Sequence, residues 1–206
     1  MGTFRRIGKV KNIDIFIGSS IDEFKTERQE LINFIYDLRD ILSDNGYVFR
    51  LMPKICENED NAMSLTRKQD DYNLLIKNSR MCLFLFGKKV GNYSLEELNC
   101  AFSTFSDRGD GSPVINIFFR NAKDGNPVDP SVEKLEAELV GKQKEFFRFS
   151  NLETVKYRIL QNLTEFHEFE GLSSRFEMKD GFLCLWNHRI VDMGKTEGVD
   201  IGRNRN

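Results

Sequence analysis

Residues 81–105 read MCLFLFGKKVGNYSLEELNCAFSTF. The first six residues of this stretch are apolar and end at Gly87, which is typical of a β-strand buried on both faces. A polar loop with a second glycine, Gly91, follows, and Ser94 begins a predicted helix. A buried strand, a glycine-marked loop and a helix start are the parts from which an open α/β sheet builds a ligand crevice at the carboxyl ends of its strands.

The same alternation of strands and helices extends on both sides of this stretch. Strands are predicted at residues 13–17, 47–52, 81–86, 113–119 and 145–149, and the helices between them at 21–43, 63–78, 94–105 and 131–140. Alternating elements of this kind predict an α/β fold with a mostly parallel central sheet, helices on both faces and right-handed crossovers.

The C-terminal part departs from this alternation. Ser150 and Glu153 have the spacing of a capping box and predict a further helix, and residues 182–193 predict a small β-hairpin. The last residues, 194–206, are polar and glycine-rich like a linker, so we expect the chain to be the front part of a longer protein. The predicted organisation is an α/β domain over residues 1–150 and an extension over residues 151–206.

Composition narrows the function classes. The chain has 206 residues, 40% of them hydrophobic, and a formal net charge of −2, which predicts a folded core and no direct binding of nucleic acid. Four scattered cysteines without a CxxC pair predict reduced thiols in a cytoplasmic protein, and two histidines far from any such pair predict no metal site. No apolar run approaches the roughly 20 residues that a membrane span needs.

Two segments carry a family resemblance. The stretch IDIFIGSSIDEFKTERQEL, at residues 13–31, and YSLEELNCAF, at residues 93–102, resemble the Toll/interleukin-1 receptor (TIR) domain, and in particular bacterial TIR-like domains. Those domains have a strand followed by Ser-Ser and then Glu-Arg, matched here by Ser19-Ser20 and Glu27-Arg28. Their Trp-Cys-x-x-Glu-Leu motif aligns with residues 93–98, where tyrosine and serine replace the tryptophan and cysteine while Glu97-Leu98 agrees.

The resemblance covers residues 13–150 and implies a flavodoxin-like, three-layer TIR-like fold. Enzymatic members of the family hydrolyse NAD at the nicotinamide–ribose bond, and Glu97 matches their catalytic glutamate. The resemblance also implies a homo-oligomer at the N-terminus of a bacterial defence or signalling protein. NAD would be the substrate, and no separate cofactor is expected.

A single carboxylate is chemically sufficient for this reaction. Nicotinamide in NAD is already a cationic leaving group, so one carboxylate can stabilise the oxocarbenium-like sugar without a second acid. We expect Gly18, Ser19, Ser20 and Gly87 to line the crevice, with the Ser-Ser turn and Arg28 facing the phosphates. Stacking on the nicotinamide or adenine ring would come from one of three aromatic residues, Phe24, Phe86 or Tyr93.

Simpler interpretations stand beside these. Ser94 and Glu97 have the spacing of a capping box, so Glu97 could serve only its own helix. Ser20 and Glu23 have the same spacing and predict a capping box, so Gly18-Ser19-Ser20 could be a plain helix start. Arg28 could be solvated on a helix flank, and Glu96 is expected to face solvent. Two other functions remain open: a non-enzymatic TIR-like self-association module, and an enzyme like the nucleoside 2-deoxyribosyltransferases.

Overall fold

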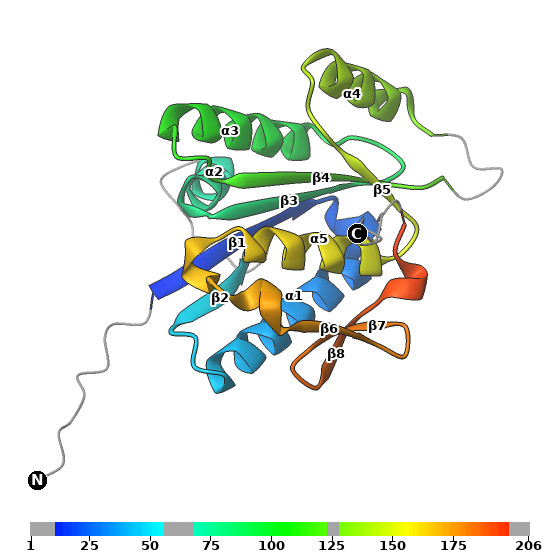
Figure 1. Ribbon diagram of the computed structural model, residues 1–206. Helices are drawn as coiled ribbons and strands as arrows, with labels where there is room; N and C mark the ends of the chain where they lie inside the picture. Colours follow the sequence, from blue (N-terminus) through cyan, green and yellow to red (C-terminus); the bar gives the residue numbers. More distant parts are fainter. Residues whose placement is uncertain (1–10, 56–67, 123–127, 198–206) are drawn as a thin grey trace, which may run out of the picture.

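The computed structural model describes residues 11–55, 68–122 and 128–197. Its centre is a parallel sheet of five strands in the order β2-β1-β3-β4-β5 (Figure 1). The strands are β1 (Lys11–Ser19), β2 (Phe49–Lys54), β3 (Met81–Phe86), β4 (Val114–Arg120) and β5 (Phe147–Phe149). This is the strand order of flavodoxin-like folds, which confirms the predicted fold class.

Helices cover both faces of this sheet (Figure 1). They are α1 (Ile21–Asp44), α2 (Lys68–Asn78), α3 (Asn92–Arg108), α4 (Pro130–Gly141) and α5 (Leu152–Thr164). Helices α1 and α5 pack on one face, and α2, α3 and α4 on the other. Most of the acidic segment after β2 and the predicted start of α2, within residues 56–67, lie outside the described residues.

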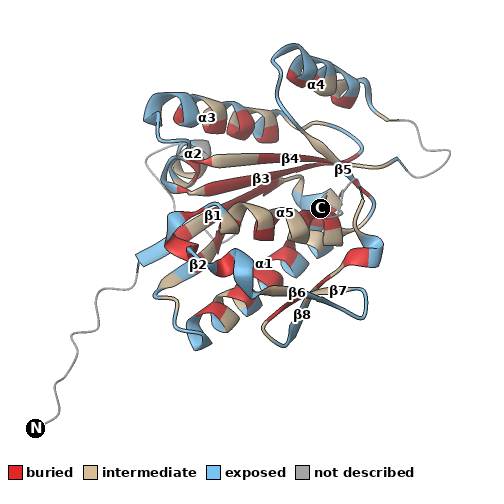
Figure 2. Ribbon diagram, viewed as in Figure 1, coloured by how far each residue is buried: buried red, intermediate tan, exposed pale blue. Residues whose placement is uncertain are grey.

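The two faces explain why β3 is apolar along its whole length. Successive side chains of a strand point to opposite faces, so each residue of β3 enters one of two hydrophobic cores. Met81, Leu83 and Leu85 join the α1–α5 core. Cys82, Phe84 and Phe86 join the core under α2, α3 and α4. Every residue of β3 is buried, as Figure 2 shows.

The C-terminal region packs against the sheet through α5. Leu152, Val155 and Ile159 lie in the same core as Ile15 of β1 and Leu31 of α1. The division drawn at residue 150 therefore marks the end of the family resemblance, and the hydrophobic core continues across it. None of the helices within the described ranges is long and apolar enough to cross a membrane.

A separate antiparallel sheet follows α5. It consists of β6 (Phe176–Lys179), β7 (Phe182–Leu185) and β8 (His188–Asp192). The predicted hairpin at residues 182–193 corresponds to β7 and β8, whereas β6 was not predicted. Short 3-10 helices flank this sheet, at His167–Phe169, Leu172–Arg175 and Met193–Lys195.

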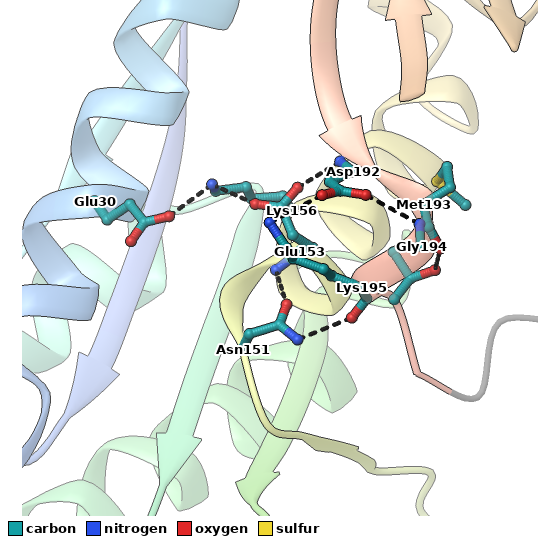
Figure 3. A network of polar contacts seen from close by, with 9 residues as sticks. Glu30, Asn151, Glu153, Lys156, Asp192, Met193, Gly194 and Lys195 are labelled. Carbon is teal, nitrogen blue, oxygen red and sulfur yellow. Dashed lines mark hydrogen bonds and ion pairs between the residues drawn. The ribbon is translucent and has the colours of Figure 1, made fainter. Parts of the chain in front are cut away.

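Polar contacts fasten this small sheet to α5 and α1 (Figure 3). The Lys156 ammonium donates to Glu30 of α1 at 2.7 Å and to Glu153 of α5 at 2.8 Å. The other carboxylate oxygen of Glu153 accepts from the backbone N–H of Asp192, at the end of β8, at 2.7 Å. One lysine and one glutamate thus join three elements distant in the sequence.

The start of α5 corrects one sequence prediction. The helix is capped by Asn151, whose side chain accepts from the backbone N–H of Glu153, and Ser150 precedes the cap. The predicted capping box of Ser150 and Glu153 is therefore wrong. Asparagine is as good an N-cap as serine. Because Asn151 caps the helix, the carboxylate of Glu153 is free to take part in the network in Figure 3.

Candidate functional site

The carboxyl ends of β1 and β3 lie side by side at one edge of the sheet. Ser19, the last residue of β1, is in register with Leu85, the penultimate residue of β3. From β1 the chain continues to β2 on one side, whereas from β3 it continues to β4 on the other. In open α/β sheets such a topological switch point is where ligands bind, so we take this edge as the candidate site.

Two glycines allow close approaches at this edge. A Cβ atom at Gly18 would lie 2.8 Å from the ring of Phe84, so the absent side chain makes room for an aromatic ring of the neighbouring strand. A Cβ atom at Gly87 would lie 2.0 Å from a carboxylate oxygen of Glu23. Both predicted crevice glycines therefore serve packing at the edge, and Gly87 brings the loop after β3 against the start of α1.

The serines at the junction of β1 and α1 differ from a simple helix cap. Ser20 occupies the N-cap position of α1 with extended backbone angles, yet its side chain makes no capping hydrogen bond. The predicted capping box of Ser20 and Glu23 is therefore wrong. The hydroxyl oxygen of Ser19 is buried and has no hydrogen-bond partner among the described residues. A buried polar atom without a partner is costly, so this hydroxyl is suited to a ligand or a water molecule.

The carboxylates of α1 have roles that the sequence did not reveal. The backbone N–H of Lys88 donates to Glu23 at 2.7 Å, which ties α1 to the β3–α3 loop. Glu27, one turn further, pairs with Arg120 at the end of β4. The guanidinium carbon of Arg120 lies 4.1 Å from the centre of the Phe24 ring. The four-residue spacing of Glu23 and Glu27 could have indicated these contacts from the sequence, since it places both side chains on one face of the helix.

Glu97 does not cap its own helix. Helix α3 begins at Asn92 with Gly91 at the N-cap, so Ser94 already lies inside the helix and the capping interpretation is wrong. The Glu97 residue is only 5% exposed, and among the described residues Glu97 and Glu168 are the two buried acidic residues. Glu96 is half-buried and accepts a long hydrogen bond, 3.4 Å, from Asn73 of α2. The expectation that Glu96 faces solvent is therefore wrong.

Glu97 interacts electrostatically with two cysteine thiols, one in β3 and one in α3. Burial raises the pKa of the Cys82 thiol in β3 well above its usual range, and the charges of Cys100 and Glu97 add to this effect. Burial likewise raises the pKa of Cys100, one turn along α3, with Glu97 among the contributing charges. The carboxylate of Glu97 therefore acts on groups at the interface between α3 and β3, where electrostatic interactions are stronger than in water.

Two of the three predicted stacking residues are wrong. Phe24 is fully buried in the α1–α5 core, and Phe86 is 2% exposed and stacks on Phe119 with ring centroids 5.4 Å apart. Neither ring is open to a ligand. Tyr93, in the first turn of α3, is 70% exposed and remains accessible for stacking.

Arg28 lies on the opposite side of the sheet from Glu97. It belongs to α1 and is 3% exposed, so the interpretation as a solvated arginine is wrong. Arginine is almost never buried without a partner. The structure thus gathers Gly18, Ser19, Ser20 and Gly87 at the sheet edge, with Tyr93 in the first turn of α3 and Glu97 and Arg28 buried on either side.

No group of three or more histidine, cysteine, aspartate or glutamate side chains that could hold a metal ion occurs in the described ranges. The described residues line polar cavities between α1 and β8, beside Trp186, and at the amino end of the sheet, and Glu97 lines none of these.

Searches against family models and curated proteins give no match for this chain. Among solved structures, the metal-soaked Flv1 flavodiiron core from Synechocystis sp. PCC6803 is similar, with 10% sequence identity and a TM-score of 0.34. The match covers 68% of this chain and 30% of that chain. This chain therefore spans less than a third of that protein, and a likeness this distant carries no argument about activity.

Proposed function

We propose that the chain is a TIR-like NAD glycohydrolase, part of a bacterial defence or signalling protein, with Glu97 as its catalytic carboxylate. The observation that carries the proposal is the placement of Glu97. It is a buried acidic residue in the second turn of α3, the helix that follows β3, and capping does not explain it. Charged side chains are rarely buried without a specific role.

The reaction breaks the bond between C1′ of the ribose and the ring nitrogen of nicotinamide. The bonding electron pair leaves with nicotinamide, which becomes neutral, and a water oxygen attacks C1′ and releases a proton to solvent. The sugar gains positive charge on the way. The carboxylate of Glu97 would stabilise that charge, and its burial strengthens the interaction because little water screens it.

The rest of the edge offers contacts for the dinucleotide. The hydroxyl of Ser19 lacks a partner among the described residues, and the start of α1 follows directly with backbone N–H groups suited to phosphate. Tyr93 presents an exposed ring beside the start of α3. These features fit a bound nucleotide. Phe24 and Phe86 are not among the proposed contacts, because both rings are buried in the core.

The test is product identification after incubation of the assembled, full-length protein with NAD. We expect free nicotinamide and ADP-ribose by proton NMR with the wild type and none with Glu97→Ala. Intact NAD after prolonged incubation of the wild type would contradict the proposal. Adding a free purine or pyrimidine base to the same reaction separates hydrolysis from the base exchange expected of a deoxyribosyltransferase-like enzyme.

A non-enzymatic self-association module is the second candidate. Its support is the exposure of large apolar side chains on α2 and α3, two helices that pack against each other. Leu74 is 57% exposed, Tyr93 70% and Phe105 40%. Exposed apolar surface of this kind often marks a contact with another protein. This function predicts that Glu97→Ala keeps signalling intact while Leu74→Asp abolishes assembly, as measured by light scattering.

A further inference from the structure

A polar cavity lies at the amino-terminal edge of the parallel sheet, opposite the candidate site. It has a volume of about 420 Å³. Four segments line it: the start of β1, the turn between α2 and β3, the turn between α3 and β4, and the 3-10 helix after α5. The cavity is within the size range of small-molecule sites, and the proposed NAD site does not involve it.

The cavity brings together three cationic and three anionic side chains. They are Lys11, Arg80 and Arg108 on one hand, and Asp14, Asp110 and Glu168 on the other. Among the described residues, these three cations form no ion pair with these three carboxylates. Two of the carboxylates have other cationic neighbours: Lys54 Nζ lies 4.0 Å from Oδ2 of Asp14, and Nδ1 of His167 lies 3.0 Å from Oε2 of Glu168. The formal charges balance, so the cavity is suited neither to a free anion nor to a free cation.

Three buried polar atoms at this cavity have no hydrogen-bond partner among the described residues. They are Nε of Arg80, Oδ1 of Asp14 and Oε2 of Glu168. The side chain of Glu168 is 3% exposed. Its Oε2 atom makes no hydrogen bond within the described part of the chain but lies 3.0 Å from Nδ1 of His167, which is an ion pair when that histidine is protonated. Each unmet group of this kind costs stability, which a ligand carrying both donors and acceptors would relieve.

Arg80 is held in place by its neighbours. Its guanidinium carbon lies 4.9 Å from the centre of the Phe166 ring. Its backbone N–H donates to the backbone carbonyl of Asp14 at 2.8 Å, and its own carbonyl accepts from the backbone N–H of Val114 at 3.0 Å. A guanidinium fixed in this way presents a planar pair of donors that matches a carboxylate.

We infer that this cavity binds a small zwitterion of the amino-acid class. The carboxylate of the ligand pairs with Arg80, and its ammonium group lies between Asp14 and Glu168. The strands of the sheet separate this cavity from the candidate NAD site, so the ligand does not compete with NAD.

The test is a titration of isotope-labelled protein, followed by amide chemical shifts. The probes are glycine and L-glutamine, with acetate and methylammonium as the separate halves of the zwitterion. We expect saturable shifts confined to residues around Asp14, Arg80 and Glu168, with each half-probe binding at least tenfold more weakly than glycine. Absence of saturable shifts with glycine and L-glutamine would overturn the inference. Equal shifts from all four probes would overturn it as well, because binding would then not depend on a zwitterion.

Variants add a second line of test. Arg80→Gln and Glu168→Gln each remove one charge, and we expect at least tenfold weaker binding of glycine. Arg50→Gln, an exposed arginine in β2, is the matched control and should bind glycine like the wild type. Unchanged affinity in both cavity variants would contradict the inference. The comparison of the four probes on the wild type decides the question even if a variant does not fold.

Discussion

The packing of single atoms shapes the carboxyl edge of the sheet, and Gly18 is the clearest case. A methyl group at this position would lie 2.8 Å from the Phe84 ring and 3.0 Å from the Phe16 ring, both of which are fully buried. We therefore expect Gly18→Ala to lower the free energy of unfolding by about 1–3 kcal/mol, because a full core has no room to adjust.

Urea unfolding measures this effect. Gly141→Ala is the control, since no atom lies within 4 Å of its added methyl group and its backbone needs no left-handed conformation. A Gly18→Ala variant as stable as wild type would mean that the Phe84 ring can move, and that this edge is looser than the structure indicates.

Asp129 gives a pH-dependent prediction. Its side chain caps α4, and hydrogen bonds from the Ser131 side chain and backbone N–H hold its pKa below the ordinary value of 3.8. Since the folded pKa is the lower one, the cap contributes stability above pH 3.8 and loses it as the pH falls through the folded pKa. We expect Asp129→Ala to melt at a lower temperature than wild type at neutral pH, with the difference shrinking in acid.

Thermal unfolding at a series of pH values checks the Asp129 prediction. Asp129→Asn keeps a capping acceptor and should melt near wild type at neutral pH. A difference between wild type and Asp129→Ala that persists unchanged down to the lowest pH would refute the role of the ionised carboxylate.

At the level of elements, Lys156 joins α1, α5 and β8. Burial opposes its charge, but hydrogen bonds to Glu153 and Glu30 outweigh that effect and raise its pKa above 10.5. The ion pairs of Lys156 therefore stabilise the folded protein below pH 10.5. This contribution is lost as the pH rises through the pKa of Lys156 in the folded state. Because the ammonium is partly solvated, we expect Lys156→Met to cost only about 1 kcal/mol at neutral pH.

Denaturant unfolding tests the Lys156 network. Lys142→Met removes an exposed lysine that pairs with Glu138 four residues away, and it should leave the denaturant midpoint unchanged. Equal effects of the two substitutions would show that the network in Figure 3 has no more weight than a surface ion pair.

The sequence predicted the elements better than their ends. Strong patterns, such as the apolar run of β3 and the stripe of α1, identified each strand and helix of the parallel sheet. The predicted starts of α3 and α5 were wrong because Gly91 and Asn151, as well as serine, can cap a helix. Strand β6, FEMK, does alternate apolar and polar residues, but over only four positions, and this short signal was missed.

The candidate site was predicted only in part, for a related reason. The order of strands fixes where the switch point lies, so Gly18, Ser19, Ser20 and Gly87 could be placed at the edge from the sequence. The direction of a side chain depends on the exact helix register and the packing of both faces. Phe24 and Phe86 looked like ligand contacts, but the structure uses both as core residues.

At the level of the whole molecule, α5 belongs to the main core. Leu152, Val155, Ile159 and Leu163 are buried with residues of α1 and β1. We therefore expect a fragment ending at residue 150 to lose cooperative unfolding and to bind the dye ANS, because it exposes one face of the sheet. A fragment ending at residue 197 should unfold like the whole chain. A cooperative transition in the shorter fragment would support an independent domain over residues 1–150.

The central proposal is that the carboxylate of Glu97 stabilises the transition state of NAD hydrolysis. The adjacent residue Glu96, also on α3, provides the direct comparison. The measurement is the rate of nicotinamide release from NAD by assembled wild type, Glu97→Gln and Glu96→Gln, each verified as folded. We predict a fall of about 10²–10³ for Glu97→Gln and a rate close to wild type for Glu96→Gln. Equal rates for all three proteins, or no release by the wild type, would contradict the account.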